Sequence, residues 1–522
     1  MNIEEKLKKY SPLGSDAKID GNIVMFRVPE TAIAGVCDRL YFEDKLQLVT
    51  ITAFDERASG MGYRIAYLFG VPGENVFIMP YLILRDKEEF PSITDKIHEA
   101  SSHERKIRTF FGLEPVGHPY PRMIVLHENW PEKMHPLRKD FDWKTRPPEA
   151  KGVYEFQKVE GEGIYEIPVG PVHAGIIEPG HFRFSVAGEE IVLLEPRLGY
   201  KHKGTEKLFE VLPLADKLRL SERVSGDTSF THALAFCQAL EAAGSVRVPE
   251  RAQYLRTIYS ELERLANHLN DFGFILMDTG YAFGGANGAR LRETVMQWNE
   301  RLTGSRFLRG ANAIGGVNKD ISSEQGTELI AFLKALGEDF EDVVEICNDS
   351  ASVLNRLAIT GRLDRQCAID HGILGVAARA LGIDNDARTA YPYAAYDKLK
   401  FATSLAEDGD VLARFEVRIG EIKSSLDILE RALKEMPAGA IKSEKAIVLR
   451  KNAFAVGMTE GWRGAIAYLI ATDGNGEVSR VDVRDPSLLN WAVLGYAGKG
   501  NIVPDFPLIN KSFNLSYSGN DL

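Results

Sequence analysis

The sequence predicts an α+β protein: an N-terminal mixed α/β domain followed by a mainly α-helical domain with a bundle of long helices and small β elements. Two patterns lead to this fold class. In the first part of the chain, short runs rich in β-branched and aromatic residues predict strands. From about residue 160, apolar residues recur at helical spacing over long stretches. A stretch rich in proline and charge, 131–152, lies between the two patterns.

The first domain is expected to contain four strands and one long helix. The helix fits residues 92–110. The strands are expected at 23–28, 46–54, 63–70 and 76–84. The domains are expected at 1–145 and 165–522, with a linker at 146–164.

Three long helices are expected in the second domain. Pro249 opens the first, because a proline at the first helical position loses no hydrogen bond. Ser322 and Gln325 have the spacing of a capping box and open the second, which can run to Leu354. The third spans 410–436. Helices well above the average length favour an extended bundle.

The third helix also carries charges at helical spacing. The set is Asp410, Arg414, Arg418 and Glu421. Because residues three or four apart are neighbours on a helix surface, this spacing predicts a ladder of ion pairs along the helix.

Composition excludes some classes of function. The chain of 522 residues carries 63 Lys and Arg against 74 Asp and Glu, a formal charge of −11. This balance disfavours a nucleic-acid partner, which requires a basic face. No apolar run reaches the roughly 18 residues of a membrane span, and the charged start is unlike a signal peptide. These features and the few cysteines indicate a cytoplasmic protein.

The four cysteines do not form a recognisable site. No two of them have C-x-x-C spacing, so neither a zinc ribbon, a redox dithiol nor a c-type haem site is indicated. Cys237 and Cys347 lie on apolar helical stripes, which is typical of buried, unreactive cysteines.

The segment 222–232 reads ERVSGDTSFTH. It resembles the first metal-binding motif of nickel–iron hydrogenases, E-R-V-C-G-x-C-x-x-x-H, with Ser225 and Thr228 at the two cysteine positions. Near the end of the chain, Ser516 and Gly519 stand where that family has its second cysteine pair. Nickel–iron centres need four soft thiolates, which hydroxyl groups cannot replace. We therefore expect no metal to be bound by this chain.

Further motifs extend this resemblance over nearly the whole chain. The second domain resembles the large subunit shared by complex I and nickel–iron hydrogenases, on the motifs at 170–173, 178–183, 200–207, 261–269 and 314–317. The first resembles the small peripheral-arm subunit of complex I, on 103–105, 111–119 and 135–141. Lys106 and Thr109 depart from that pattern, which has acidic residues there. The fused order is similar to energy-converting hydrogenases of the formate hydrogenlyase type.

The resemblance implies two charged residues in the metal cavity. Glu206 matches a glutamate that relays protons beside the nickel, and Arg463 matches an arginine that overhangs the metal. One interpretation is a proton path or anion site that uses both side chains. The other is a carboxylate and a guanidinium that pair to stabilise an emptied cavity. In either case the two segments are expected to approach the same space.

A second group of residues faces the expected cavity or its mouth. Arg223 matches a position close to the iron–sulfur cluster of the partner subunit, where a cation raises the reduction potential; an ordinary salt bridge with Glu222 or Asp227 is the alternative. The tyrosine and histidine that bind the quinone in complex I are replaced by Gly226 and Ile177. The polar residues that could build another site are His173, Asp227 and His232, with Tyr200 and His181. The loop 382–393 is expected to close the cavity.

The function implied is that of a large subunit in a membrane-associated, ion-translocating oxidoreductase complex, without hydrogenase activity. Electrons would come from a 4Fe–4S cluster in an iron–sulfur small subunit, and a quinone is the candidate acceptor. The other expected partners are membrane-embedded subunits of a complex I-like assembly, which places the chain peripherally on the inner face of the membrane. The alternative is a non-catalytic coupling subunit with a vestigial cavity.

Overall fold

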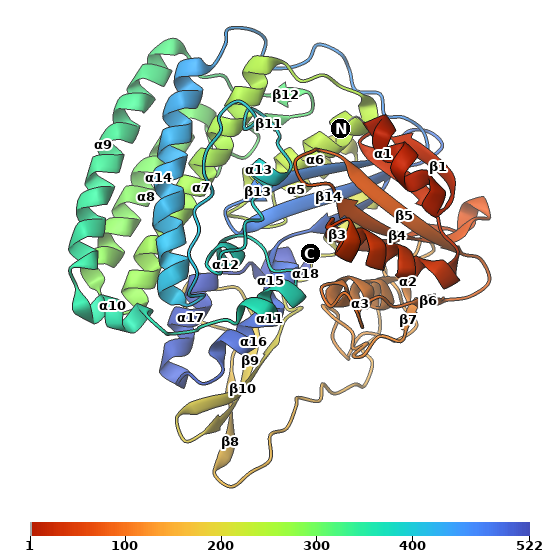
Figure 1. The fold of residues 1–522 in the computed structure, drawn as a ribbon, viewed down its shortest axis with the longest axis horizontal. Helices are drawn as coiled ribbons and strands as arrows, with labels where there is room; N and C mark the ends of the chain where they lie inside the picture. The colour runs from red at the N-terminus through yellow and green to blue at the C-terminus, as the bar shows by residue number, and fades with distance from the viewer. Residues whose placement is uncertain (1–2) are drawn as a thin grey trace.

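The computed structural model describes residues 3–522. It has the expected α+β architecture: in Figure 1 the N-terminal sheet lies on the right, the bundle of long helices on the left, and the strands β13 (Phe454–Gly461) and β14 (Gly464–Thr472) between them. The first sheet has the strand order β1-β2-β5-β4-β3, in which only β2 and β5 are parallel. The strands are β1 (Ser15–Asp20), β2 (Ile23–Arg27), β3 (Gln47–Glu56), β4 (Gly62–Gly70) and β5 (Phe77–Leu84). All four predicted strands are confirmed.

The helices of the first domain cover one face of this sheet. They are α1 (Ile3–Tyr10), α2 (Glu30–Asp38) and α3 (Ala100–Phe111). The predicted start of α3 at residue 92 is wrong, because Ser92, Ile93 and Thr94 instead donate hydrogen bonds to the buried carboxylate of Glu104. A small parallel pair, β6 (Glu89–Pro91) and β7 (Glu114–Val116), flanks the helix.

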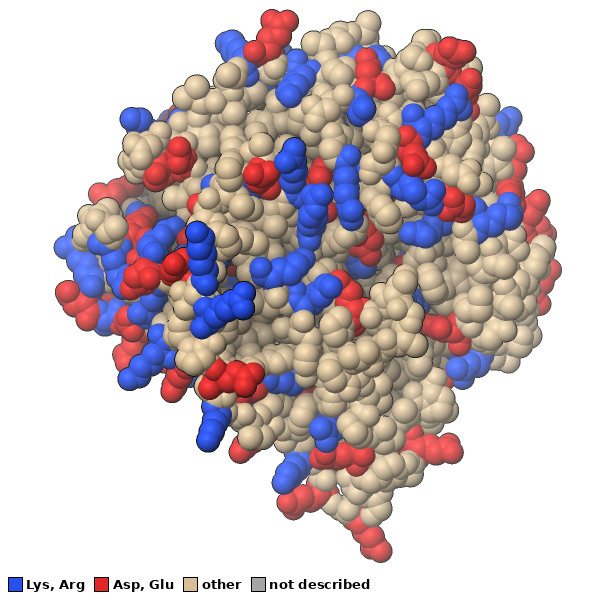
Figure 2. All heavy atoms as spheres, turned by 180° about the vertical axis from the view of Figure 1, so that it is seen from behind, with Lys and Arg blue, Asp and Glu red and all other residues tan. Residues whose placement is uncertain are grey.

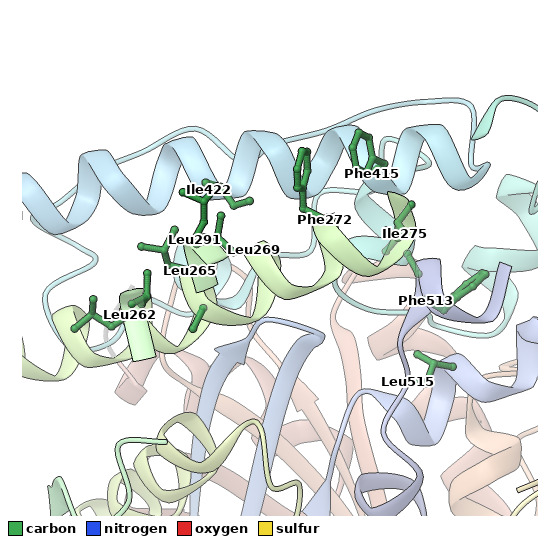
Figure 3. Close-up of a cluster of buried hydrophobic side chains, with 14 of the residues drawn as sticks. Leu262, Leu265, Leu269, Phe272, Ile275, Leu291, Phe415, Ile422, Phe513 and Leu515 are labelled. Atoms are coloured by element: carbon green, nitrogen blue, oxygen red, sulfur yellow. The ribbon is translucent and has the colours of Figure 1, made fainter. Parts of the chain in front are cut away.

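Four long helices form the bundle of the second domain. They are α7 (Glu250–Asp278), α8 (Ala282–Thr303), α9 (Ser323–Asn348) and α14 (Val411–Glu435). The apolar stripe of α7, including Leu265, Leu269 and Phe272, faces Phe415 and Ile422 of α14 (Figure 3). The three predicted helices and the Ser322–Gln325 capping box are confirmed. The predicted continuation to Leu354 is wrong, because α9 ends at Asn348 and a separate helix, α10 (Ala351–Leu357), follows.

Helix α8 was not expected from the sequence. Its first turns are rich in glycine, which is a poor helix former. These glycines allow a close approach to α7: a Cβ atom on Gly288 would lie 2.5 Å from the Cα atom of Gly273. Tertiary packing therefore overrides the local preference.

The charges on α14 do not form the predicted ladder, because these four side chains are buried and each reaches a different neighbour. Asp410 caps the helix and accepts from Ile359 N, and Arg418 pairs with Asp271 of α7 at 2.9 Å. Arg414 donates to Ser512 and to backbone carbonyls. Glu421 lies 2.7 Å from both Arg379 and His268.

Two three-stranded sheets also belong to the second domain, besides the short pair β11 (Asn312–Ala313) and β12 (Gly316–Val317). One, formed by β8 (Ile164–Val169), β9 (His181–Ala187) and β10 (Glu190–Arg197), projects from the body at the bottom of Figure 1. The other is formed by β13 (Phe454–Gly461), β14 (Gly464–Thr472) and β15 (Val478–Arg484). One face of this sheet packs on α6 (Ser229–Gly244), and the other packs on the uncovered face of the first domain's sheet.

The remaining elements are short, and residues 117–163 between β7 and β8 contain no helix or strand. The short elements are α4 (Thr205–Val211), α5 (Leu214–Ser221), α11 (Arg365–Asp370), α12 (Val376–Arg379), α13 (Ala387–Ala390), α15 (Ser487–Asn490), α16 (Leu494–Gly498), α17 (Phe506–Phe513), α18 (Tyr517–Asp521), β11 (Asn312–Ala313) and β12 (Gly316–Val317). Within residues 3–522, no helix is both long and apolar enough to cross a bilayer. Acidic and basic side chains are interspersed on the face in Figure 2, with several basic ones gathered near its middle.

Candidate functional site

The four positions that match the family's metal ligands meet in space. Ser225 and Thr228 precede α6, and Ser516 and Gly519 lie at the start of α18. The hydroxyl oxygens of Ser225 and Ser516 are 2.8 Å apart, and Gly519 N donates to Ser516 Oγ at 2.9 Å. Segments almost 300 residues apart therefore build one buried, hydrogen-bonded centre.

A carboxylate fills the space beside Gly519. A Cβ atom on Gly519 would lie 2.5 Å from the carboxyl carbon of Asp485, so a larger residue could not enter without moving that group. Asp485 Oδ2 lies 3.1 Å from His232 Nε2, and His232 Nδ1 lies 3.0 Å from the hydroxyl of Tyr468. Burial opposes ionisation of Asp485, but the contact with His232 outweighs it and lowers the pKa of this carboxyl group.

Arg463 pairs with Asp227 at the same centre. Arg463 Nη1 and Nη2 lie 2.6 and 2.8 Å from the two carboxylate oxygens, and Nη1 also lies 3.4 Å from Ser225 and 3.3 Å from Thr228. Burial acts to raise the pKa of Asp227, but the charge of Arg463 prevails and lowers it to about 2. The Asp227 side chain is nevertheless 38% exposed, so one side of this pair, here called the mouth of the centre, is open to solvent.

The donors present do not fit a nickel–iron group. The hydroxyls at the family's ligand positions bond to one another and to a guanidinium, which is itself a cation. Within residues 3–522, no group of three or more His, Cys, Asp or Glu side chains is arranged to hold a metal ion.

Glu206 lies in a different network, at the seam between the domains. Its carboxylate accepts from Lys106 Nζ of α3 at 2.8 Å, from Val483 N at 2.9 Å and from Arg480 at 3.4 Å. Lys106 also pairs with Asp482 at 3.2 Å. The expected pairing of Glu206 with Arg463 is not present: Glu206 pairs with Lys106 of the first domain and Arg480 of β15, and Arg463 pairs with Asp227.

The network at the seam is buried, and its two positive charges balance its two negative ones. Burial acts to lower the pKa of Lys106, but Asp482 and Glu206 prevail and raise it. Burial likewise acts to raise the pKa of Asp482, but Lys106 and Arg480 lower it to about 2. The neighbouring His103 is held neutral, since burial lowers its pKa to about 3.

Sequence reasoning missed three members of these networks, namely Arg480, Asp482 and Asp485. A signal was present: Arg480, Asp482 and Arg484 alternate along β15, and alternate residues of a strand share one face. The valines of β15 lie on one face of the strand and the charged residues on the other. Because most strands of this chain are buried on both faces, such a pattern indicates buried ion pairs.

A small cavity adjoins Glu206. Its volume is about 20 Å³, enough for about one water molecule. The charged residues that line it are Lys106, Glu206, Lys207 and Asp521, and Phe110, Leu137 and Leu488 are among the apolar ones. It is not the wide polar tunnel that a large acceptor molecule would require.

The remaining candidates lie around the centre rather than in it. Arg223 is on the surface, with a side chain 54% exposed, 3.7 Å from Glu222, and donates to the carbonyl of Arg219. His173 Nε2 lies 2.7 Å from the carbonyl of Gly180, in a loop that exposes apolar side chains. Tyr200 stacks edge-on against His127, and His181 packs on Phe156.

The loop 382–393 completes a buried charge cluster. Asp386 and Arg388 from this loop pair with each other at 2.6 Å, and Arg388 also pairs with Glu261 of α7 at 3.0 Å. Arg379 joins Glu421 and Glu460 to the same cluster. The loop therefore anchors α7, α14 and β13 to one another.

Comparison with known proteins matches both parts of the chain. Residues 26–147 match the family described as respiratory-chain NADH dehydrogenase, 30 Kd subunit. Residues 278–455 match the corresponding 49 Kd subunit family. In solved structures, the chain is similar to a chain of the archaeal membrane-bound sulfane sulfur reductase, described as a respiratory membrane complex. The TM-score is 0.65 at 26% identity, and the match covers 69% of this chain and 99% of that one.

Curated relatives match over nearly their full length. Formate hydrogenlyase subunit 5 of Escherichia coli (strain K12) is 33% identical, over 93% of this chain and 86% of its own. Hydrogenase-4 component G of the same strain is 35% identical, over 95% and 88%. The C/D protein of the NADH-quinone oxidoreductase of Phocaeicola vulgatus is 31% identical, over 82% and 86%. The chain therefore belongs to the family of fused 30 Kd and 49 Kd subunits that complex I-like and energy-converting hydrogenase membrane complexes share.

Proposed function

We propose that this chain is the large subunit of a membrane-associated, ion-translocating oxidoreductase complex and that it has no hydrogenase activity. The observation that carries the proposal is the centre itself. The segments that carry the family's four ligand positions meet in it, but three hydroxyl residues and a glycine stand at those positions, with the Asp227–Arg463 pair beside them. Membership of the family supports the assignment to a membrane-associated complex. The hydroxyl groups at the ligand positions argue against the binding of nickel.

In this proposal an iron–sulfur small subunit lies over the mouth beside Asp227. Arg223, which is exposed there, lies where it can approach the partner's 4Fe–4S cluster, and its charge stabilises the added electron. The relatives' names include a quinone oxidoreductase, so a quinone is one candidate acceptor. The residues that could contact an acceptor are Asp227 at the mouth, with His232 behind Asp485, and His173 in the adjoining loop. The complex would hold the chain against the inner face of the membrane through its embedded subunits.

The decisive experiment is purification of the tagged chain from native membranes, followed by identification of subunits, metals and quinones. We expect an iron–sulfur subunit and membrane-embedded subunits to co-purify and nickel to be absent. Stoichiometric nickel, or hydrogen uptake by the complex, would contradict the proposal. So would a monodisperse monomer with native activity.

A second function, as a coupling subunit without catalysis, is favoured by the small cavity and the closed network around Glu206. Glu206→Gln separates the two. If Glu206 takes part in turnover, the variant assembles but loses turnover. If the cavity is vestigial, turnover stays near wild type and only stability changes. Glu430→Gln, which removes a carboxylate from an exposed ion pair on α14, is the control.

A further inference from the structure

Two buried carboxylates near the candidate site differ in their counter-charges. Glu206 has two cations within reach, Lys106 at 2.8 Å and Arg480 at 3.4 Å. Glu263, on α7, is 5% exposed, yet within residues 3–522 no cation forms an ion pair with it. A buried carboxylate without a cation is costly to keep ionised, so its protonation state is open to change.

Glu263 is held by the first turn of α6. Its Oε1 accepts from Phe230 N at 2.6 Å, and its Oε2 accepts from Thr231 N at 3.1 Å and from the Thr231 hydroxyl at 2.6 Å. Amides of a first helical turn have no partner within the helix, and the positive end of the helix dipole favours an anion there. The carboxylate is thus fixed against the segment that carries Asp227 and Thr228.

The cations around Glu263 are engaged elsewhere. Arg463 is bound to Asp227, and Arg309 donates to Gly226 and Ser229. Arg264 of α7 donates to the carbonyls of Glu460 and Gly461 and lies near Glu421. The charge that acts most directly on Glu263 is therefore that of Asp227, which is negative. Burial, reinforced by Asp227 and only partly offset by the hydrogen bonds from α6, raises the pKa of Glu263 to about 7.

We propose that Glu263 is the proton-binding residue of the Asp227–Arg463 centre. It takes up one proton when negative charge arrives at the centre and releases it when that charge leaves. The carboxylate becomes a carboxylic acid, only one O–H bond forms, and the local charge changes by one unit. This inference rests on the redox role proposed above and names the proton carrier within it.

Glu206 is the weaker candidate for that task. Its protonation would leave Lys106 and Arg480 with Asp482 as their only carboxylate in the seam network. Glu206 therefore already has two cations as partners, whereas Glu263 has none among residues 3–522.

The test is an infrared titration of the purified complex between about pH 5 and pH 9. The C=O stretching band of a protonated carboxylic acid should titrate with a midpoint of about 7. Glu263→Gln should remove this component, and Glu206→Gln should keep it. A component that survives in Glu263→Gln, or that disappears in Glu206→Gln, would overturn the assignment.

Two further variants serve as a control and as an independent test of the assignment. Glu99→Gln is the matched control: Glu99 is another buried carboxylate, whose pKa burial raises to about 8, and its loss should leave the component near pH 7 unchanged. Asp227→Asn removes the negative neighbour and should move the midpoint of Glu263 to lower pH. This second variant carries the test if Glu263→Gln fails to assemble, and an unchanged or raised midpoint would count against the proposal.

The outcome also separates this inference from the proposed function. A titrating Glu263 in a complex without an iron–sulfur subunit would refute the redox role and keep the proton site. A non-titrating Glu263 in a complex that contains such a subunit would refute the proton site alone.

Discussion

The seam network and the Asp227–Arg463 centre are built from the same chemistry but in different surroundings. At the seam, Lys106, Glu206, Arg480 and Asp482 are all buried, with two cations balancing two carboxylates. At the centre, Asp227 stays 38% exposed. Removing one residue of a buried network leaves a charged side chain with neither water nor an ionic partner. A charged side chain at the mouth can instead be solvated by water when its partner is lost. The seam therefore holds the domains together, and the centre remains accessible to a partner.

The largest effect is expected from Lys106→Met. The substitution keeps much of the side-chain volume but leaves Glu206 and Asp482 with Arg480 as their only nearby cation. The free energy of unfolding should fall by about 3–5 kcal/mol, as measured by denaturant titration of the full chain. Adding Glu206→Gln should restore part of the loss, because the double variant no longer carries the excess charge. A loss below about 1 kcal/mol would show that water enters the seam.

Stability at the seam should also depend on pH through Glu99. Burial raises the pKa of Glu99 to about 8, and Arg484 only partly offsets this. Because the folded-state pKa exceeds the unfolded one, the contribution of Glu99 to stability is complete below about pH 4.5 and is lost as pH rises through about 8. Glu99→Gln should flatten this dependence, by up to about 5 kcal/mol between those limits. Parallel pH curves for the two proteins would contradict the assignment.

A smaller effect is expected at the mouth from Arg463→Lys. Lysine keeps the charge but loses the two-pronged contact with Asp227 and the bond to the carbonyl of Asn514. The unfolding free energy should fall by about 1–2 kcal/mol, because solvent can replace part of the contact. A loss as large as that of Lys106→Met would erase the distinction between the two regions.

The smallest effect on stability is expected from Arg223→Ala. Its side chain is 54% exposed and makes one short contact, to a backbone carbonyl. The free energy of unfolding should change by less than about 0.5 kcal/mol. If Arg223 faces an iron–sulfur partner, the variant should lower the reduction potential of the partner's cluster, while Arg219→Ala, at a still more exposed neighbour, should not. If the reduction potential of the partner's cluster is the same in both variants, Arg223 does not act on the cluster and is not part of the proposed site.

Apolar patterns predicted most of the regular elements well. The strands β2 to β5 are correct because continuous runs of β-branched and aromatic residues mark strands buried on both faces, and the helix α7 is correct because apolar residues recur at helical spacing along it. Charge spacing misled on α14, where Arg418 and Glu421 were expected to take part in a ladder of ion pairs along the helix but are buried and paired with Asp271 and Arg379 of other segments. Charge spacing alone cannot tell a solvated face from a buried one.

The candidate site was predicted in its location but not in its pairings. Family motifs correctly brought Ser225 and Ser516 together, because the segments that carry them are recognisable. The pairing of Glu206 with Lys106 could not be read in advance: the two residues lie on helices from different domains, 100 positions apart. Only the docking of the domains places that lysine against that glutamate.

The two sheets that pack face to face across the seam have a consequence for how the two halves of the protein fold and assemble. Met25 and Leu68 from the first domain and Val456 and Leu469 from the second share one apolar core. If the halves were produced as separate chains, each would present a wide hydrophobic surface to the cell until it met the other. Joined in one polypeptide, they search for each other at an effective concentration on the order of millimolar, whatever the level of expression. Fusion thus turns a concentration-dependent assembly step into a folding step and shortens the time during which either half is prone to aggregate.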